Sequence, residues 1–382
     1  MTRTVAPWTS SAWSAALERL DRLVTLEGYP AFTQLGRWHL VPKGEERPGF
    51  WPADMGWIVG FLPGMLWLAY RVTHQERYVA LALEWCRPFV GRQADDTTHD
   101  LGFVFFPSYV QGYTITGERW LRDAAIGAAR TLGRRFNEAG GFLRAWGPVD
   151  APELAGKTTI DAMMNLALLY WAARETGDER LAEWATRHAE TTARTLVRAD
   201  ASTFHVYEFD PHRGTPLRGS THQGFSDNSA WARGQAWGLY GFARAGQATG
   251  RADFLAVAQR LADFFVEHLP DHRVPPWDFR APGAAMAARD SSAGAIAASG
   301  LLLLSAVLPS VEGQRYEREA LRLLEGLWHG AGNPPESDAD GLLLHATLHK
   351  PAGRAVDEAL VFGDYYFMEA LARLLDEGTA AA

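Results

Sequence analysis

The sequence predicts an all-α protein in which six helical hairpins close into an (α/α)6 toroid, with residues 1–382 forming a single domain. Three observations lead to this prediction: a repeated helix-turn-helix unit, an alternation of apolar and amphipathic helices, and two chain ends that complete the alternation. Repeats spaced roughly 45 to 75 residues apart are typical of solenoids and rings. A pairing of the two chain ends favours the closed ring.

The repeated unit is an apolar, aromatic-rich helix, a short polar turn and an amphipathic helix that opens near an aromatic residue or Leu. Four of the five visible turns contain a glycine at or near the end of the first helix, which suits a left-handed cap. The turns are VTHQERY (72–78), ITGERWL (115–121), ETGDERL (175–181), ATGRADF (248–254) and, more loosely, VEGQRY (311–316).

The helices on the two sides of each turn differ in polarity. Those before it, such as MMNLALLYWAARE (163–175), are apolar on most faces and should form the inner layer. Those after it, such as RLAEWATRHAETTARTLV (180–197), show one apolar stripe and should form the outer layer. The amphipathic segment 11–24 and the apolar segment 364–375 can then pair as a sixth hairpin.

Composition limits the classes of partner. The formal net charge is -8 and the pI is near 5.9, so we expect no binding to nucleic acid or to an anionic membrane. The single cysteine, Cys86, cannot form an internal disulfide and should be a buried, inert thiol. The N-terminus lacks the apolar run of a signal peptide and no stretch resembles a membrane span. We therefore expect a cytoplasmic protein that is a monomer or a homodimer.

Long inserts interrupt the repeat on one side only, between an outer helix and the next inner helix. They cover residues 91–108, 139–161 and about 198–228. These loops should gather over the N-terminal ends of the inner helices, at the mouth of the central cavity. Helix N-termini carry partial positive charge that suits a carboxylate ligand, so we expect the functional site there.

Five aspartates stand at or just before the expected starts of inner helices: Asp100, Asp161, Asp227, Asp290 and Asp364. Because Asp is a favoured N-cap residue, each of them could serve only as a helix cap. Asp100 and Asp161 differ in having apolar and aromatic neighbours, in HDLGFVFFPSY and TTIDAMMNL. Such surroundings should raise the pKa of a carboxyl group and favour a general acid.

Aromatic residues and histidines are abundant near the expected rim. Flat aromatic faces stack on sugar rings. Zinc-binding signatures are absent, so we expect no metal and no cofactor. Arg233, at the rim end of an apolar helix, needs an anionic partner, either a nearby aspartate such as Asp227 or a substrate carboxylate. The remaining rim candidates are Trp38, Trp51, Trp57, Trp146, Trp231, Trp237 and Trp277, with His99, His205, His212 and His222.

Four blocks resemble glycoside hydrolase family 88, the unsaturated glucuronyl hydrolases. The blocks are HDLGF (99–103), TTIDAMMNLALLYWA (158–172), LRGSTHQGFSDNSAWARGQAWGLYGF (217–242) and GDYYFMEAL (363–371). The resemblance implies that Asp161 is the general acid and base and that Asp100 assists it. It also implies a substrate-binding set of Trp57, His99, His205, Gln223, Trp231, Arg233, Trp237 and Lys350.

The chemistry implied by this resemblance is hydration of a C4=C5 double bond in a terminal unsaturated uronic acid of a disaccharide or oligosaccharide. Asp161 would protonate C4 while a water that it activates attacks C5. The resulting hemiketal opens and releases the aglycone, so the carboxylate-spacing rule of ordinary glycosidases does not apply. A mildly acidic to neutral pH optimum is expected.

The sequence departs from the family pattern at three positions. Leu62 replaces a frequent Trp, while Thr347 and His349 stand where members that accept sulfated disaccharides commonly have serine. The choice of aglycone, and a preference for sulfated ones, therefore stay open. Alternative functions are an unsaturated rhamnogalacturonyl hydrolase, a sugar 2-epimerase on the same fold, and a carbohydrate-binding ring without catalysis.

Overall fold

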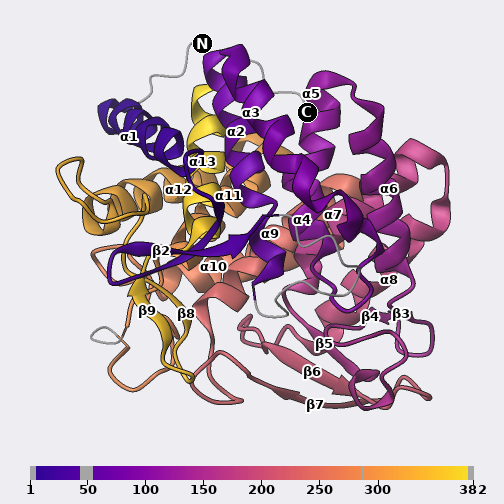
Figure 1. Cartoon of the computed structure of the whole chain (residues 1–382). Helices are drawn as coiled ribbons and strands as arrows, with labels where there is room; N and C mark the ends of the chain where they lie inside the picture. The colour runs from indigo at the N-terminus through magenta and orange to yellow at the C-terminus, as the bar shows by residue number, and fades with distance from the viewer. Residues whose placement is uncertain (1–5, 44–54, 285–287, 377–382) are drawn as a thin grey trace.

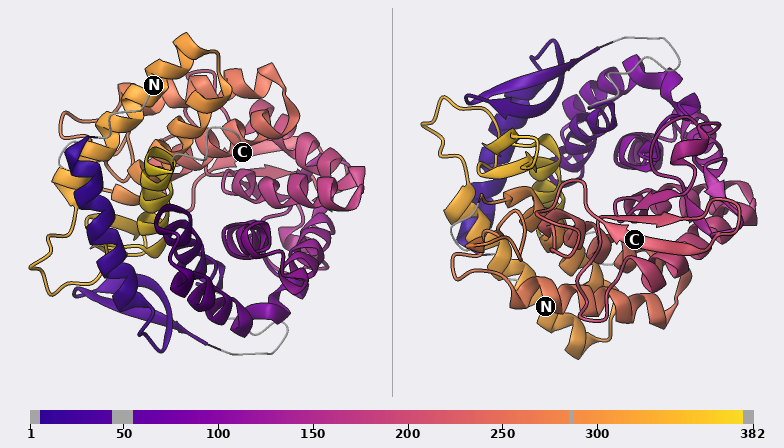
Figure 2. Two further views of the ribbon diagram at one scale, coloured as in Figure 1. Left: turned by 90° about the horizontal axis from the view of Figure 1, so that it is seen from above. Right: turned by 90° about the horizontal axis from the view of Figure 1, so that it is seen from below.

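The computed structural model describes residues 6–43, 55–284 and 288–376. Within these ranges the helices form two concentric layers around an axis (Figures 1 and 2), as expected for an (α/α)6 toroid. The inner layer contains α2 (Phe61–Thr73), α4 (Leu101–Phe105) with η3 (Phe106–Val110) and α5 (Gln111–Thr116), α7 (Ala162–Thr176), α9 (Ala232–Thr249), α11 (Ser291–Val307) and α13 (Val361–Leu375). The outer layer contains α1 (Pro7–Leu23), α3 (Glu76–Cys86), α6 (Arg119–Gly133), α8 (Glu179–Thr195), α10 (Ala252–Glu267) and α12 (Ser310–Ala331).

Contacts between neighbouring inner helices close the ring. Each inner helix packs against the next in chain order, and α13 returns to pack against α2. The first helix, α1, lies against α13, α12 and α2, so the first and last helices lie side by side (Figure 2). The prediction that the chain ends form the sixth hairpin is confirmed.

Burial distinguishes the two layers as the polarity pattern predicted. In α7 every residue from Ala162 to Ala173 is buried, whereas α8 buries only a stripe that includes Leu181, Ala185 and Ala189. A helix enclosed by neighbours on all sides needs apolar residues all round, and a surface helix needs one apolar face. The alternation in the sequence therefore reflects the two layers directly.

Left-handed caps end three of the inner segments at glycine. Gly117, Gly177 and Gly250 have φ values of 72°, 73° and 70°. The hairpin without glycine uses His74 in the same conformation, with φ 56°. The expectation for VEGQRY was wrong: Gly313 lies inside α12, and the turn falls at residues 308–309, where a proline precedes the helix.

Short strands occupy the connections that run from an outer helix to the next inner helix. They form four small sheets in the described part of the chain, and most lie at the end of the ring that Figure 1 shows at the bottom. The strands are β1 (Gly28–Gln34), β2 (Arg37–Pro42), β3 (Phe136–Asn137), β4 (Phe142–Leu143), β5 (Lys157–Thr159), β6 (Val206–Phe209), β7 (Pro216–Ser220), β8 (Ala346–His349) and β9 (Arg354–Glu358). The connections also contain three 3-10 segments in the described residues: η1 (Gly56–Ile58), η2 (Arg87–Ala94) and η4 (Pro152–Leu154).

Two further expectations concern the single cysteine and membrane-spanning helices. Cys86 is fully buried and unpaired, and burial raises the pKa of its thiol, as expected for an inert cysteine. Among the helices of the described ranges, none combines the length and the apolar character needed to cross a bilayer.

The close approach of α9 to α7 gives a stability prediction. A Cβ added at Gly241 would lie 2.4 Å from Met163 Cβ and 3.0 Å from its main-chain carbon. We expect Gly241→Ala to lower the free energy of unfolding by about 1–2 kcal/mol, because this overlap outweighs the roughly 1 kcal/mol gained in helix propensity. Gly91→Ala is the control, since nothing lies within 4 Å of its added Cβ. Equal midpoints for the two variants in urea unfolding would contradict the prediction.

His188 gives a prediction about pH. Its ring is fully buried, its Nδ1 accepts the Leu143 N–H at 3.0 Å, and burial lowers its pKa from 6.5 to about 3. The unfolded chain binds this proton near pH 6.5 and the folded chain does not. Stability should therefore be full above pH 6.5 and fall toward pH 3, by about 1.4 kcal/mol per pH unit from this group. His188→Asn keeps an acceptor and does not titrate, so urea unfolding across this range should show a shallower slope; an unchanged slope would refute the assignment.

Candidate active site

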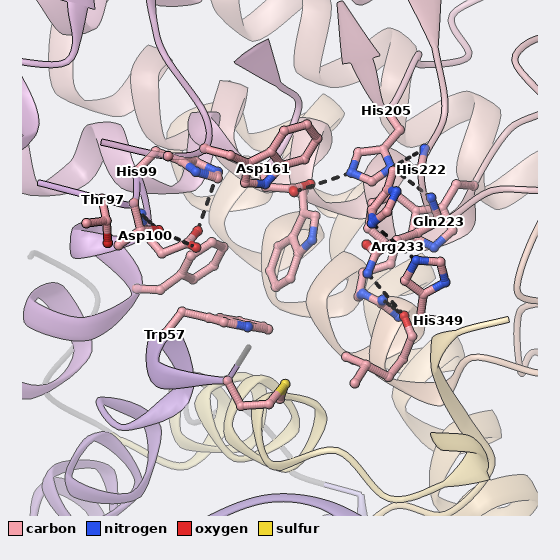
Figure 3. A pocket seen from close by; sticks show the side chains of 18 of the residues that line it. Trp57, Thr97, His99, Asp100, Asp161, His205, His222, Gln223, Arg233 and His349 are labelled. Atoms are coloured by element: carbon pink, nitrogen blue, oxygen red, sulfur yellow. Dashed lines mark hydrogen bonds and ion pairs between the residues drawn. The ribbon is translucent and has the colours of Figure 1, made fainter. Parts of the chain in front are cut away.

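A cavity of about 530 Å³ opens at the N-terminal ends of the inner helices. Its lining comes from the segments before α2, α4, α7 and α9, from the starts of these helices and from the β8–β9 hairpin (Figure 3). The site was expected at this mouth. The lining includes nine of the ten catalytic and substrate-binding residues that the resemblance implied: Trp57, His99, Asp100, Asp161, His205, Gln223, Trp231, Arg233 and Trp237.

Aromatic rings surround the inner end of the cavity. Trp57 lies 5.0 Å from Phe362 and 5.3 Å from Phe103 between ring centroids, and Phe103 meets Trp237 edge to face at 5.0 Å. Trp57 precedes α2 and Phe362 lies in α13, so ring closure is what brings these two side chains together. The result is an apolar surface on which a sugar ring can stack.

The short sheet β5-β6-β7 brings Asp161 to His205. The antiparallel register pairs Thr159 with Val206, so the residue just after β5 lies opposite the residue just before β6. The Ile160 N–H donates to the His205 carbonyl at 2.9 Å, which extends this pairing. As a result His205 Nε2 lies 3.6 Å from Asp161 Oδ2.

Hydrogen bonds from the backbone fix the state of the His205 ring. Its Nδ1 accepts the N–H groups of His222 and Gln223, each at 3.2 Å. Because a backbone N–H only donates, the ring proton of neutral His205 lies on Nε2, which faces Asp161. The other carboxyl oxygen, Asp161 Oδ1, is buried and has no hydrogen-bond partner among the described residues.

Asp100 lies beside a second histidine. His99 Nε2 is 3.4 Å from Asp100 Oδ1, while the Thr98 hydroxyl lies 2.8 Å from Asp100 Oδ2. The His99 ring is 2% exposed and the Asp100 side chain 18%. Asp100 and Asp161 therefore each lie beside one buried histidine and line the cavity.

Capping explains only part of the aspartate pattern. Asp290 is a cap, since its side chain accepts the Ala293 N–H, and Asp364 accepts two backbone N–H groups from residues 342 and 343. Asp100 and Asp161 occupy N-cap positions without any side-chain capping bond. Their carboxyl groups are therefore available to the cavity. Asp227 precedes α9 by several residues and instead accepts the Thr221 N–H.

Arg233 has a partner that differs from the expected one. Its Nη1 lies 2.5 Å from Asp290 Oδ2, and the pair is almost completely buried, with 2% and 0% exposure. The guanidinium also donates to the carbonyls of Thr347 and Leu348. Asp227 is exposed, lies several residues before the start of α9 and makes no ion pair with Arg233. Arg233 thus joins α9, α11 and strand β8 beside the cavity.

Several other candidates lie elsewhere. Lys350 is exposed in the turn after β8 and is absent from the cavity lining. Leu62 is buried in α2 outside the lining, and the Thr347 hydroxyl donates to the Arg289 carbonyl. Of the rim aromatics and histidines, Trp146 and His222 line the cavity, Trp38, Trp277 and His212 do not, and Trp51 falls outside the described residues. No cluster of metal-binding side chains is present within the described ranges.

His222, expected only as a rim histidine, and His349, noted only as a departure from the family pattern, form a pair that the sequence did not predict. Their Nε2 atoms lie 3.3 Å apart at the cavity wall, and burial lowers the pKa of both rings, that of His349 to about 4. Arg354 on β9 also lines the cavity. The sequence signals were the place of His222 in a rim loop and the departure at position 349; nothing indicated that they meet, because the hairpin with His349 and Arg354 is far from His222 in the sequence.

Two carboxylates beside an aromatic surface that suits sugar stacking, inside an (α/α)6 ring, are the arrangement of a glycoside hydrolase. A model of Glycosyl Hydrolase Family 88 matches residues 33–271. The unsaturated glucuronyl hydrolase of Bacillus sp. (strain GL1) is 38% identical over 323 residues, which are 83% of this chain and 86% of that protein. The chain belongs to glycoside hydrolase family 88, and the resemblance seen in its sequence blocks is confirmed.

Further relatives and solved structures agree. The unsaturated chondroitin disaccharide hydrolase of Streptococcus pneumoniae (strain ATCC BAA-255 / R6) is 35% identical over 322 residues, covering 83% of this chain and 81% of that protein. The crystal structure of the unsaturated glucuronyl hydrolase from Bacillus sp. GL1 superposes with a TM-score of 0.90 at 34% identity, covering 97% of this chain and 98% of that one. This superposition over nearly the whole of both chains shows that the two proteins share the toroid fold.

The buried ion pair gives a prediction. Asp290→Ala leaves the Arg233 guanidinium buried without its counter-charge, and we expect a loss of about 3–5 kcal/mol in unfolding free energy. Asp227→Ala removes an exposed carboxylate that accepts one backbone N–H, and should cost less than about 1 kcal/mol. Guanidinium unfolding of both variants measures the difference. Equal losses of unfolding free energy in the two variants would show that the ion pair with Asp290 is not what stabilises buried Arg233.

Proposed function

We propose that this hydrolase removes a terminal 4,5-unsaturated uronic acid from short oligosaccharides by hydrating its C4=C5 double bond. Membership of family 88 supports this reaction, as do relatives named unsaturated glucuronyl hydrolase and unsaturated chondroitin disaccharide hydrolase. A solved relative from Streptococcus agalactiae at TM-score 0.80 is described as complexed with dGlcA-GalNAc6S.

In the proposed reaction Asp161 is the general acid and base. It transfers a proton to C4 and receives one from the water that attacks C5, which leaves a hemiketal at C5. Opening of this hemiketal leaves a hemiacetal at C1, from which the aglycone departs as an alcohol. The observation that carries the assignment is the place of the carboxyl group, which lines the cavity with 18% of its side chain exposed and has Oδ2 3.6 Å from His205 Nε2. A carboxyl group held at this position by a neighbouring ring can exchange a proton with a substrate in the cavity.

Arg233 and the helix N-termini suit the carboxylate of the uronic acid. Three of the five guanidinium N–H groups are used by Asp290, Thr347 and Leu348, so two remain. The starts of α4, α7 and α9 point at the same cavity and add partial positive charge. We propose that Trp57 and Trp237 supply the apolar surface for the sugar ring, with His99, His205, Gln223 and Trp231 around it.

The aglycone side of the site would be formed by the β8–β9 hairpin. His349 and Arg354 from this hairpin line the cavity, and Lys350 does not. His349 stays neutral at neutral pH, since its pKa is about 4. A neutral imidazole beside Arg354 differs from the serine of members that accept sulfated disaccharides, so the aglycone has to be found by a substrate panel.

The proposed function is tested by the near-ultraviolet absorbance of the conjugated double bond. Unsaturated disaccharides from chondroitin, hyaluronan, heparin, gellan, ulvan and pectin should be compared with wild type and Asp161→Asn. We expect absorbance to fall with at least one glucuronate-type substrate, and kcat to drop about 10²–10⁴-fold or more in the variant. Asp227→Asn, outside the cavity, is the matched control. Turnover by Asp161→Asn at the wild-type rate would remove the assignment, and exclusive turnover of the pectin product would favour the rhamnogalacturonyl alternative.

A further inference from the structure

The backbone holds the two histidines beside the cavity carboxylates, His99 and His205, in opposite tautomers. His99 Nδ1 lies 2.9 Å from the Ala145 carbonyl oxygen. A carbonyl oxygen only accepts, so Nδ1 carries a proton and Nε2 of the neutral ring is a lone pair. His205 has the reverse arrangement, because its Nδ1 accepts two backbone N–H groups. In its neutral form His205 therefore presents a proton to Asp161, whereas His99 presents a lone pair to Asp100.

Hydrogen bonding also determines which oxygen of the Asp100 carboxyl group can carry a proton. The Thr98 hydroxyl donates to Oδ2 at 2.8 Å, so the oxygen left for a proton is Oδ1, which faces His99 Nε2 at 3.4 Å. With both groups deprotonated at these atoms, two lone pairs would face each other in a largely buried place. One proton on the line between Oδ1 and Nε2 removes that repulsion. Thr159, fully buried, lies 3.2 Å from the same nitrogen and can donate or accept as needed.

We propose that His99 and Asp100 hold one proton between them, and that His99 is a positioning residue that keeps this pair without net charge beside the substrate. The inference rests on the proposed function, since the substrate is taken to carry a carboxylate. An ionised Asp100 with a neutral His99 would add a negative charge next to that carboxylate and weaken binding. The shared proton leaves the cavity free of this repulsion.

Charged and titratable side chains from the neighbouring elements surround the His99–Asp100 pair. Arg92 is neutralised by Asp95 at 2.9 Å, and His188 is neutral because burial lowers its pKa to about 3. Arg135 donates to the Ala145 carbonyl at 2.8 Å and thereby fixes the acceptor of His99 Nδ1. Asp96 and Arg144 lie near Arg135, and Asp161 stands across the cavity.

The first test is the pH dependence of kcat/KM for His99→Asn. Asparagine keeps a donor for the Ala145 carbonyl and lacks an atom at Nε2. The Asp100 carboxyl group then has no ring nitrogen with which to share a proton, so its negative charge faces the substrate carboxylate. Because a carboxylate loses its charge in acid, we expect a defect in kcat/KM of more than about tenfold at pH 8, mostly through KM, that becomes smaller as the pH is lowered. A defect of the same size at all pH values would mean a merely structural role and would overturn the proposal.

The second test does not need turnover. Protein labelled with ¹⁵N-histidine, with signals assigned by the loss of one set in His99→Asn and another in His205→Asn, reports the tautomers by NMR. We expect a protonated Nδ1 for His99 and an unprotonated Nδ1 for His205 near neutral pH. A His99 ring protonated on Nε2 with bare Nδ1 overturns the inference whether or not the enzyme accepts unsaturated disaccharides. Failure of the substrate panel alone, with the tautomers as expected, would instead remove the proposed function.

Discussion

Closure of the ring is the constraint on which the rest of the structure depends. Each outer helix returns the chain to the same end, so all inner helices begin there, and the packing of α13 against α1 and α2 closes them into a ring. That end collects the helix N-termini, with their partial positive charge, and the long inserts that precede them. An open solenoid would spread the same side chains along a surface. The closed ring turns residues from distant repeats into the lining of one cavity.

The inserts then fix the chemistry of the cavity through their backbone. The pairing of β5 with β6 sets Asp161 opposite His205, and the Ala145 carbonyl, held by buried Arg135, orients His99 beside Asp100. The two carboxylates face different ring atoms, because His99 Nδ1 bonds to a carbonyl and His205 Nδ1 bonds to two N–H groups. Backbone groups are reliable for this purpose, since an N–H only donates and a carbonyl only accepts.

Much of this organisation could be predicted from the sequence because it follows local rules. Helix polarity identifies the layers, glycine in the left-handed region marks helix ends, and aspartates just before apolar helices mark the mouth. The sequence predictions were wrong where another local preference was stronger than the rule that was used. Gly313 was expected to end a helix, but helix-forming residues follow it and it lies inside α12, so the turn falls at Pro309. Asp227 was assigned to a helix start that the chain reaches only at Ala232, and Lys350 is exposed in the turn after β8 and does not line the cavity.

By itself the sequence determined the layers, the hairpins, the family and the two carboxylates, because these depend on residue type and spacing along the chain. Only the tertiary structure decided which groups meet across it. Arg233 pairs with Asp290 from the next inner helix, His222 meets His349 from a hairpin more than a hundred residues away, and each carboxylate receives its own histidine. Such contacts are set by the register of short strands and by ring closure, and neither leaves a periodic signal in the sequence.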